Sequence, residues 1–381
     1  MTGTLSGLHI GLLTASASRS GGGVFEAVVQ QARIIRSLGG AVSVFALADQ
    51  RSAEDAERFA PSQVHHLPMT GPAQIGFAPG LVSALLEADL DLLHLHGIWM
   101  YPSRAGSDWA QRTGRPYLVS PHGMLDPWIT ARGQAKKSLA RIGYERASWR
   151  GATVMHALTE REAGDIAAES GRSDTIVIPN SGPPAGEPRD AAGPAHFLYL
   201  GRIHPKKNIA ALIDAWTMRA ETLEAAGARL TIAGWGDQRD VDQLRSRVSG
   251  GPGSIHFVGP KYGAEKAALM RDARFFVLPS QSEGLPMAVL EAWAAGTPAL
   301  MSQECNLPAG FTSGAAIDCG LTAKTIATAL DRALELPDSD WQTMSDAALE
   351  LAGHMFSSEA AARQWGEAYR GLAHTSKAVP A

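Results

Sequence analysis

Short apolar runs alternate with longer segments of helical periodicity along the whole chain of 381 residues. The apolar runs predict buried β-strands at residues 9–15, 41–47, 92–97, 116–123, 152–158 and 175–180, then at 196–203, 229–236, 254–259, 274–280 and 297–302. Segments between them, such as 22–40 and 208–220, carry apolar residues at spacings of three and four, which is typical of helices. This alternation predicts parallel sheets with crossover helices, an α/β doubly wound architecture.

A Gly- and Pro-rich stretch without periodicity, "SGPPAGEPRDAAGPA", interrupts the pattern at residues 181–195. Such composition is typical of a linker between domains. We therefore expect a Rossmann-like N-terminal domain at 1–182, a linker at 183–195 and a second Rossmann-like domain at 196–355.

Composition narrows the classes of protein. A net charge of -4 disfavours a nucleic-acid binder, which normally carries a basic excess. Two cysteines are too few for a disulfide framework, so we expect a reducing cytoplasm. The first residues lack the basic region of a signal peptide, and no apolar run is long enough to span a membrane.

Two carboxylates stand out in "SEGLPMAVLEAWAAGTP", residues 282–298. Glu283 lies in the turn after a predicted strand, and Glu291 lies in a predicted helix at 286–295 that has no clearly polar face. A buried carboxylate is costly unless it is hydrogen-bonded, and the hydroxyls of a ribose diol would satisfy Glu291. The structural alternatives make Glu291 a buried ion-pair partner and Glu283 a helix cap; the residues alone leave both choices open.

Two further strand ends carry candidate phosphate ligands. "GRIHPKKN" places Arg202 after a strand and Lys207 at the start of the next predicted helix, where they could clamp a diphosphate without a metal. "SGGGV" places Gly22 and Gly23 at a helix start, where backbone N–H groups can approach a phosphate. Solvated surface cations and a simple tight turn are the alternatives.

Three histidines follow or lie within strands. His122, in "SPHGMLDPW", ends a strand where a ligand cleft is expected, so it could bond a sugar hydroxyl or a leaving phosphate. His94 and His96 alternate in "LLHLHG" and point to one face. No carboxylate-rich or cysteine partner accompanies them, so we expect no metal site.

Residues 132–150 form a basic segment with six cations and one carboxylate, Glu145. Leu139, Ile142 and Trp149 fall within about a quarter of the circumference of a regular helix, at ~100° per residue. A basic amphipathic helix can lie on an anionic membrane, whereas the alternative is packing of the apolar stripe on its own domain.

In combination these motifs resemble the retaining GT-B glycosyltransferases, the large family of phosphatidylinositol mannosyltransferases and sucrose synthases. "EGLPMAVLE" matches the E-x7-E element, "GRIHPKKN" the G-R-x-x-x-x-K element, and "IAGWGD", "SGGGV", "HALTEREA" and "IPN" are also similar to family motifs. The likeness runs in order over nearly the whole chain. It also implies a closing helix, within residues 356–381, that returns to the first domain.

The resemblance implies roles for these residues. Glu291 would hold the donor ribose, and Glu283 would lie at the transferred sugar with the backbone of Gly284 and Leu285. Arg202 and Lys207 would neutralise the diphosphate, Gly22 and Gly23 would close over it, and His122 would contact the donor sugar. No metal and no cofactor are expected beyond the substrate, a GDP- or UDP-linked sugar.

The expected activity is retaining, metal-independent transfer of a hexose-like sugar to a saccharide or lipid-linked acceptor in cell-surface polysaccharide synthesis. It would take place in the cytoplasm or at the inner face of the membrane. A GT-B nucleotide-sugar epimerase and a non-catalytic nucleotide-sugar sensor are the alternatives. Two departures from the family, Ser181 for a glycine and Ala309 for a glutamate, bear on donor or acceptor details.

Overall fold

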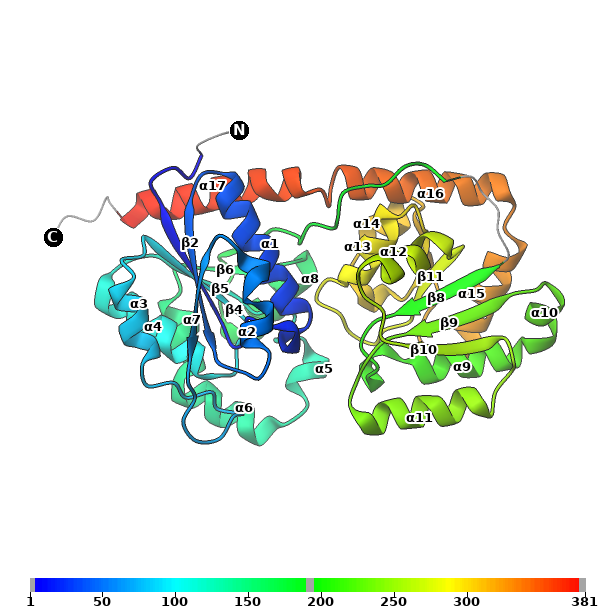
Figure 1. Ribbon diagram of the computed structural model, residues 1–381, viewed down its shortest axis with the longest axis horizontal. Helices are drawn as coiled ribbons and strands as arrows, with labels where there is room; N and C mark the ends of the chain where they lie inside the picture. Colours follow the sequence, from blue (N-terminus) through cyan, green and yellow to red (C-terminus); the bar gives the residue numbers. More distant parts are fainter. Residues whose placement is uncertain (1–3, 190–194, 377–381) are drawn as a thin grey trace. The chain divides into compact units, whose positions relative to one another are not determined.

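The computed structural model describes residues 4–189 and 195–376, which form two compact units. Unit 1 comprises residues up to Asn180 together with Glu359 onward, and unit 2 comprises Ser181–Ser358. Parts of the predicted first domain (1–3), linker (190–194) and C-terminal segment (377–381) lie outside the described residues. Each unit is a parallel β-sheet flanked by helices (Figure 1).

In unit 1 the seven described strands are ordered β3-β2-β1-β4-β5-β6-β7, and all pair in parallel. They are β1 (His9–Thr14), β2 (Ala41–Leu47), β3 (Gln63–Leu67), β4 (Leu92–His96), β5 (Tyr117–Ser120), β6 (Val154–Ala157) and β7 (Thr175–Val177). The helices are α1 (Gly23–Ser37), α2 (Ser52–Asp55), α3 (Leu81–Glu87), α4 (Tyr101–Thr113), α5 (Pro127–Thr130), α6 (Gln134–Ala140), α7 (Arg146–Gly151), α8 (Glu160–Ser170) and α17 (Ser358–Ser376). Short 3-10 turns η1 (Arg19–Gly21) and η2 (Ala56–Phe59) and a π-helical turn η3 (Arg141–Glu145) complete it.

In unit 2 the six described strands are ordered β10-β9-β8-β11-β12-β13, again all parallel. They are β8 (His196–Leu200), β9 (Arg229–Ala233), β10 (Ile255–Gly259), β11 (Phe275–Leu278), β12 (Ala299–Met301) and β13 (Ala316–Asp318). The helices are α9 (Ile209–Met218), α10 (Ala220–Ala225), α11 (Gln238–Ser249), α12 (Gly263–Asp272), α13 (Met287–Ala294), α14 (Pro308–Thr312), α15 (Ala323–Glu335) and α16 (Asp338–Gly353), with 3-10 turns η4 (Pro205–Lys207) and η5 (Gln303–Cys305).

All eleven predicted strands are present, whereas β3 and β13 were not predicted. Both are edge strands, since β3 pairs only with β2 and β13 only with β12 among the described strands. An edge strand is covered less completely than a central one, so it can be short or polar. The sequence of β3 is QVHHL, and β13 has three residues. The predicted doubly wound α/β fold is confirmed.

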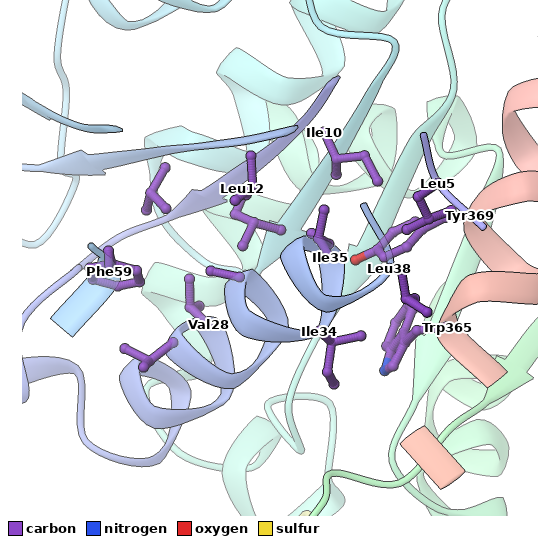
Figure 2. Packing of buried hydrophobic residues seen from close by; sticks show 14 of the residues in the cluster. Leu5, Ile10, Leu12, Val28, Ile34, Ile35, Leu38, Phe59, Trp365 and Tyr369 are labelled. Carbon is purple, nitrogen blue, oxygen red and sulfur yellow. The ribbon is translucent and has the colours of Figure 1, made fainter. Parts of the chain in front are cut away.

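The core of unit 1 lies on both faces of its sheet, because successive residues of a strand point to opposite sides. Leu12 of β1 packs in a cluster with α1 and α17, whereas Leu13 packs in a cluster with α3, α4 and α7. Figure 2 shows Trp365 and Tyr369 of α17 near Leu5 and Leu38. The last described helix therefore completes the core of unit 1 rather than that of unit 2.

Part of the predicted linker is attached to unit 2 by specific bonds. The Gly182 N–H donates to the Phe356 carbonyl at 2.9 Å, and the Gly186 N–H donates to the Ala294 carbonyl at 2.7 Å. The guanidinium of Arg189 donates to Thr297 Oγ1 at 2.7 Å. Residues 181–189 therefore fold as part of unit 2.

In both sheets the strand order reverses direction between the first and fourth strands of the unit, that is, between β1 and β4 and between β8 and β11. Crossovers leave such neighbouring strands toward opposite faces, which opens a crevice at their carboxyl ends. The loops after β8 and β11 are "GRIHPKKN" and "SEGLP", so the two most specific motifs of the chain meet at this point of unit 2. Among the described residues no helix is both long and apolar enough to cross a bilayer.

Candidate functional site

Glu283 is the centre of the site in unit 2. Its side chain is buried, with 7% of the residue exposed, in the turn between β11 and α13. Its Oε1 accepts bonds from Lys207 Nζ at 2.5 Å and from Ser280 Oγ at 2.6 Å, and Lys206 Nζ lies 3.9 Å from Oε2. Glu283 is therefore an ion-pair partner of Lys207 in the "GRIHPKKN" motif. It does not cap α13 with its side chain.

The charge state of Glu283 follows from these contacts. Burial alone would raise the pKa of its carboxyl, but Lys207 and Lys206, with the hydrogen bonds from Lys207 and Ser280, outweigh burial and lower the pKa. The group is therefore an anion at neutral pH. An anion this deep is stable only because its counter-ions are built into the fold.

The backbone of the Glu283 turn is held by the loop after β12. The Glu283 N–H donates to the Glu304 carbonyl at 3.0 Å, and Asn306 Nδ2 donates to the Glu283 carbonyl. The Gln281 N–H donates to the Lys206 carbonyl at 2.8 Å. The turn is thus fixed from two sides. Lys206 and Asn306 were missed from the sequence, although Lys206 adjoins the predicted Lys207.

Lys207 and Arg202 occupy different environments. Lys207 ends η4 instead of opening the next helix, because Asn208 adopts a left-handed conformation with φ of 58° before α9 begins. The Arg202 side chain is 54% exposed, and its guanidinium lies 3.7 Å from Asp237 Oδ2. Lys207 is therefore held at Glu283, whereas Arg202 lies near Asp237.

Two glycines let the loops after β8 and β9 pack together. A Cβ added at Gly234 would lie 1.9 Å from the Gly201 carbonyl oxygen, and one at Gly236 would lie 2.2 Å from the Ile203 carbonyl oxygen. The Ile203 N–H donates to the Trp235 carbonyl at 2.6 Å. The "IAGWGD" turn therefore needs glycine for close backbone approach, and this contact shapes the chain around Arg202.

Glu291 lies in α13, for which Pro286 is the N-cap residue, but it is less buried than predicted. Its side chain is 24% exposed, and its Oε1 accepts a bond from Lys266 Nζ of α12 at 2.6 Å. Glu291 is therefore half-buried, and the expectation of a buried carboxylate is wrong. Nothing in the sequence indicated that Lys266 is the ion-pair partner of Glu291. Leu285 is buried and Gly284 half-buried in the turn before α13.

In unit 1 the glycine loop lies between β1 and α1. Gly22 has φ of 58° and ψ of -129°, a conformation that requires glycine, and α1 begins at Gly23. The Gly22 N–H already donates to the Arg19 carbonyl at 3.1 Å. That N–H is therefore bonded within the loop.

His122 follows β5 in a left-handed conformation, with φ of 54°. Its Nε2 lies 2.9 Å from His96 Nδ1, and the two rings stack at 5.2 Å. Burial, and secondarily the neighbouring His156, lower the pKa of His122 to about 3. The imidazole is therefore neutral at pH 7 and suits a hydrogen bond to a hydroxyl better than charge stabilisation of a phosphate.

His94 belongs to a chain of hydrogen-bonded side chains. Its Nδ1 lies 2.7 Å from the Tyr369 hydroxyl, and its Nε2 lies 2.6 Å from Ser120 Oγ. Ser120 Oγ also bonds His156 Nδ1 at 2.7 Å, and His156 Nε2 bonds the Ile178 carbonyl at 2.8 Å. In the part of the chain that the structure describes, no group of three ligating side chains is arranged for a metal.

The basic segment is not one regular helix. Three pieces, α6, η3 and α7, cover residues 134–150 of it, and the π-helical turn η3 changes the rotational register between its ends. Leu139 and Ile142 are 73% and 77% exposed, whereas Trp149 is buried in the core of unit 1. The predicted single apolar stripe is therefore wrong for Trp149. The side chain of Lys136 lies outside the described residues.

Comparisons with known proteins agree with this geometry. The model of the glycosyl transferases group 1 family matches residues 187–349, and the model of the glycosyl transferase 4-like domain matches residues 22–181. A phosphatidyl-myo-inositol mannosyltransferase of Mycobacterium leprae is 29% identical over 321 residues, covering 77% of this chain and 78% of that protein. A glycogen synthase of Mycobacterium tuberculosis is 33% identical over 184 residues, 43% of each chain.

Solved structures share the fold at low sequence identity. HepE of Anabaena, in complex with UDP and glucose, has a TM-score of 0.76 at 18% identity and covers 96% of this chain and 100% of its own. A sucrose-phosphate synthase of Thermosynechococcus elongatus has a TM-score of 0.76 at 22% identity, with 97% and 100% covered. With both halves matched and the fold shared over the whole length, the chain belongs to the group 1 glycosyltransferases of GT-B fold.

Proposed function

We propose that this glycosyltransferase is a retaining hexosyltransferase. It moves a sugar from a GDP- or UDP-linked donor to a saccharide or lipid-linked saccharide acceptor in cell-surface polysaccharide synthesis. The observation that carries the proposal is the buried, ionised Glu283 bonded to Lys207, where the strand order reverses between β8 and β11. The similar mannosyltransferase and the UDP and glucose bound by HepE support a hexose on a nucleoside diphosphate.

Cleavage of the sugar–phosphate bond leaves negative charge on the diphosphate. Lys207 Nζ is fixed by Glu283, and a cation fixed before the reaction needs no reorganisation when that charge develops. Arg202, whose guanidinium is largely exposed, is proposed to contact the same diphosphate. Two protein cations supply the charge that a divalent metal supplies elsewhere, so the reaction is proposed to need no metal.

Glu291 is proposed to hold the donor ribose. In this structure its Oε1 is bonded to Lys266, so a ribose diol would share or replace that bond. A charged acceptor oxygen forms stronger hydrogen bonds with hydroxyl groups than a neutral one. The ion pair with Lys266 keeps the Glu291 side chain oriented until the nucleotide binds.

The resemblance also implies retention of the anomeric configuration through attack on the same face of the sugar. The proposed place of Glu283 is beside that sugar, with the backbone of Gly284 and Leu285. His122 is proposed to contact a sugar hydroxyl, a role that its neutral imidazole suits. Both residues would bind the sugar as positive charge develops at its anomeric carbon.

The lipid-linked acceptor suggests a site of action at the inner face of the cytoplasmic membrane. Leu139 and Ile142 are exposed in the same segment as the exposed cations Arg146 and Arg150. Apolar side chains among cations suit the interface of an anionic bilayer. We propose peripheral membrane contact through this part of the Arg132–Arg150 segment.

Release of nucleoside diphosphate tests the proposal directly. The enzyme is incubated with a panel of nucleotide sugars, each with and without saccharide acceptors, and free nucleoside diphosphate is measured. Release that requires the acceptor supports transfer. Conversion of the donor to an epimer without release would identify an epimerase, and binding without any turnover on the full panel would favour a sensor.

A further inference from the structure

Glu162 is a buried carboxylate in the first turn of α8, within the "HALTEREA" element. Only 2% of the residue is exposed. Its Oε2 accepts a bond from the Leu158 N–H at 2.8 Å, and its Oε1 accepts a bond from the Gly123 N–H at 2.5 Å. One carboxylate therefore bonds two backbone segments that are far apart in the chain.

The bond to Leu158 has an ordinary structural explanation. Thr159 is the N-cap of α8 and accepts a bond from the Glu162 N–H, and a glutamate at this third helical position commonly bonds back to the chain before the helix. That local role uses Oε2 alone. It does not account for Oε1, whose partner Gly123 is 39 positions away.

The partner of Oε1 immediately follows His122. His122 and Gly123 are both left-handed, with φ of 54° and 74°. A left-handed conformation is unfavourable for a side chain such as histidine, so it persists only where the surroundings impose it. The Gly123 N–H, held by Glu162, fixes the peptide that follows the His122 side chain, and His96 Nδ1 holds the ring of His122 at 2.9 Å.

We propose that Glu162 is a positioning residue for sugar transfer. By holding the Gly123 N–H, its Oε1 keeps His122 left-handed and so sets the direction of the imidazole. The inference rests on the proposed function, in which His122 contacts the transferred sugar. It deepens that function, because it assigns the geometry of the sugar contact to a residue on a different helix.

The proposal separates nucleotide binding from transfer. Glu283, Lys207 and Glu291, which are proposed to bind the nucleotide sugar, all lie in unit 2, whereas Glu162 and His122 lie in unit 1. Loss of the Gly123 bond should therefore lower kcat and leave the affinity for nucleoside diphosphate unchanged. If Glu162 has a purely structural role, its variants should have lower thermal stability, without a selective loss of kcat at unchanged affinity for nucleoside diphosphate.

The test compares Glu162→Gln with two control variants. The two backbone N–H groups bond different oxygens of Glu162, and Glu162→Gln replaces one of these oxygens by an NH2 group, which cannot accept a bond. Thr159→Ala weakens the same helix cap without touching the Gly123 bond, and Glu160→Gln removes an exposed carboxylate from the same turn. Glu162→Asp, which is too short to reach both N–H groups, is the second variant should Glu162→Gln fold poorly.

We expect kcat of Glu162→Gln to fall about tenfold to a hundredfold, since a misplacement of about 1 Å at a reacting centre has effects of this size. Calorimetry should show unchanged binding of nucleoside diphosphate. The NMR signals of the His122 ring, assigned with His122→Gln, should shift in Glu162→Gln and stay in place in Thr159→Ala. Both controls should keep wild-type kcat.

Wild-type kcat and an unshifted His122 signal in Glu162→Gln or Glu162→Asp would overturn the proposal, even if the variant melts lower. Failure of the proposed function looks different. If His122→Ala itself has wild-type turnover, the sugar contact of His122 is wrong. The positioning role of Glu162 is then decided by the His122 signal alone, and an unshifted signal overturns it.

Discussion

Lys207 Nζ lies 2.5 Å from Glu283 Oε1, although the two residues are 76 positions apart in the chain. Each side chain is largely removed from solvent, with 17% and 8% exposed. The pair joins the loops after β8 and β11 at the point where the strand order of unit 2 reverses. Because the ammonium group is already in place, the same contact that stabilises the fold also prepares a cation for the diphosphate.

Lys207→Ala and Arg202→Ala should both lower turnover, by about a hundredfold or more, because each removes a charged donor from the proposed diphosphate contact. Only Lys207→Ala should also lower stability, since it leaves the buried Glu283 with Lys206 3.9 Å away as its remaining cation. Arg202 is largely exposed, so its loss should not move the melting temperature. Steady-state kinetics and thermal melting measure both effects, and wild-type turnover in both variants refutes the diphosphate role.

Glu291→Gln should weaken binding of free nucleoside diphosphate about tenfold or more, since charged hydrogen bonds to the ribose are worth roughly 1.5–3 kcal/mol. Lys266→Met is the matched control, because it breaks the same ion pair but keeps the carboxylate. Calorimetry with nucleoside diphosphate should therefore distinguish the two variants. Equal affinity in Glu291→Gln and wild type, with a lowered melting temperature, would leave Glu291 a structural ion-pair residue only.

Chelation should leave transfer nearly unchanged. The reason is the proposed neutralisation of the diphosphate by Arg202 and Lys207, which replaces a divalent ion. Initial rates are measured with and without EDTA, then after addition of Mg²⁺ or Mn²⁺. A loss of activity in EDTA that either metal restores would contradict a metal-independent reaction.

Leu139→Ser combined with Ile142→Ser should reduce binding to anionic vesicles, because it removes the exposed apolar side chains of the basic segment. Binding should also weaken with salt, since each basic residue near such a surface contributes about 1 kcal/mol, screened over a Debye length. Co-sedimentation at low and high salt measures both. Met218→Ser, an exposed apolar position in unit 2, is the control, and wild-type protein that stays in the supernatant at low salt contradicts the membrane contact.

Glu162 should make stability fall as pH rises. The pKa of its carboxyl is raised to about 7, because burial, with smaller contributions from Asp165 and Asp126, outweighs the lowering effect of the bonds from Gly123 and Leu158. The folded chain thus holds this proton more tightly than the unfolded chain, whose carboxyl titrates near 4.5. The contribution is present below pH 4.5 and is lost as pH rises through about 7.

Urea unfolding of wild type and Glu162→Gln from pH 4.5 to pH 8 measures this contribution. The difference in unfolding free energy between the two proteins should change over this range by about 3 kcal/mol at most, at 1.36 kcal/mol per pKa unit. Other titrating groups cancel in that difference. Parallel pH profiles would show that Glu162 titrates normally in the folded protein.

Local sequence was sufficient for the central strands and for the two-unit organisation. Both depend on short-range patterns: apolar runs for strands covered on both faces, and spacings of three and four for helices. The candidate loops were also predictable, because functional residues of parallel sheets gather after the carboxyl ends of strands. The edge strands β3 and β13 were missed because β3 has the polar sequence QVHHL and β13 has three residues, so neither contains a long apolar run.

The partners of the charged residues were decided by the tertiary structure alone. Nothing near Glu291 in the chain indicates Lys266, and nothing near Gly123 indicates Glu162, because each pair meets only through helices that return from elsewhere. Regular periodicity also failed across η3, where one wider turn separates exposed Ile142 from buried Trp149. A sequence determines which segments can be buried, but the charge state and direction of a side chain depend on neighbours that only the assembled sheet and its crossovers bring within hydrogen-bonding distance.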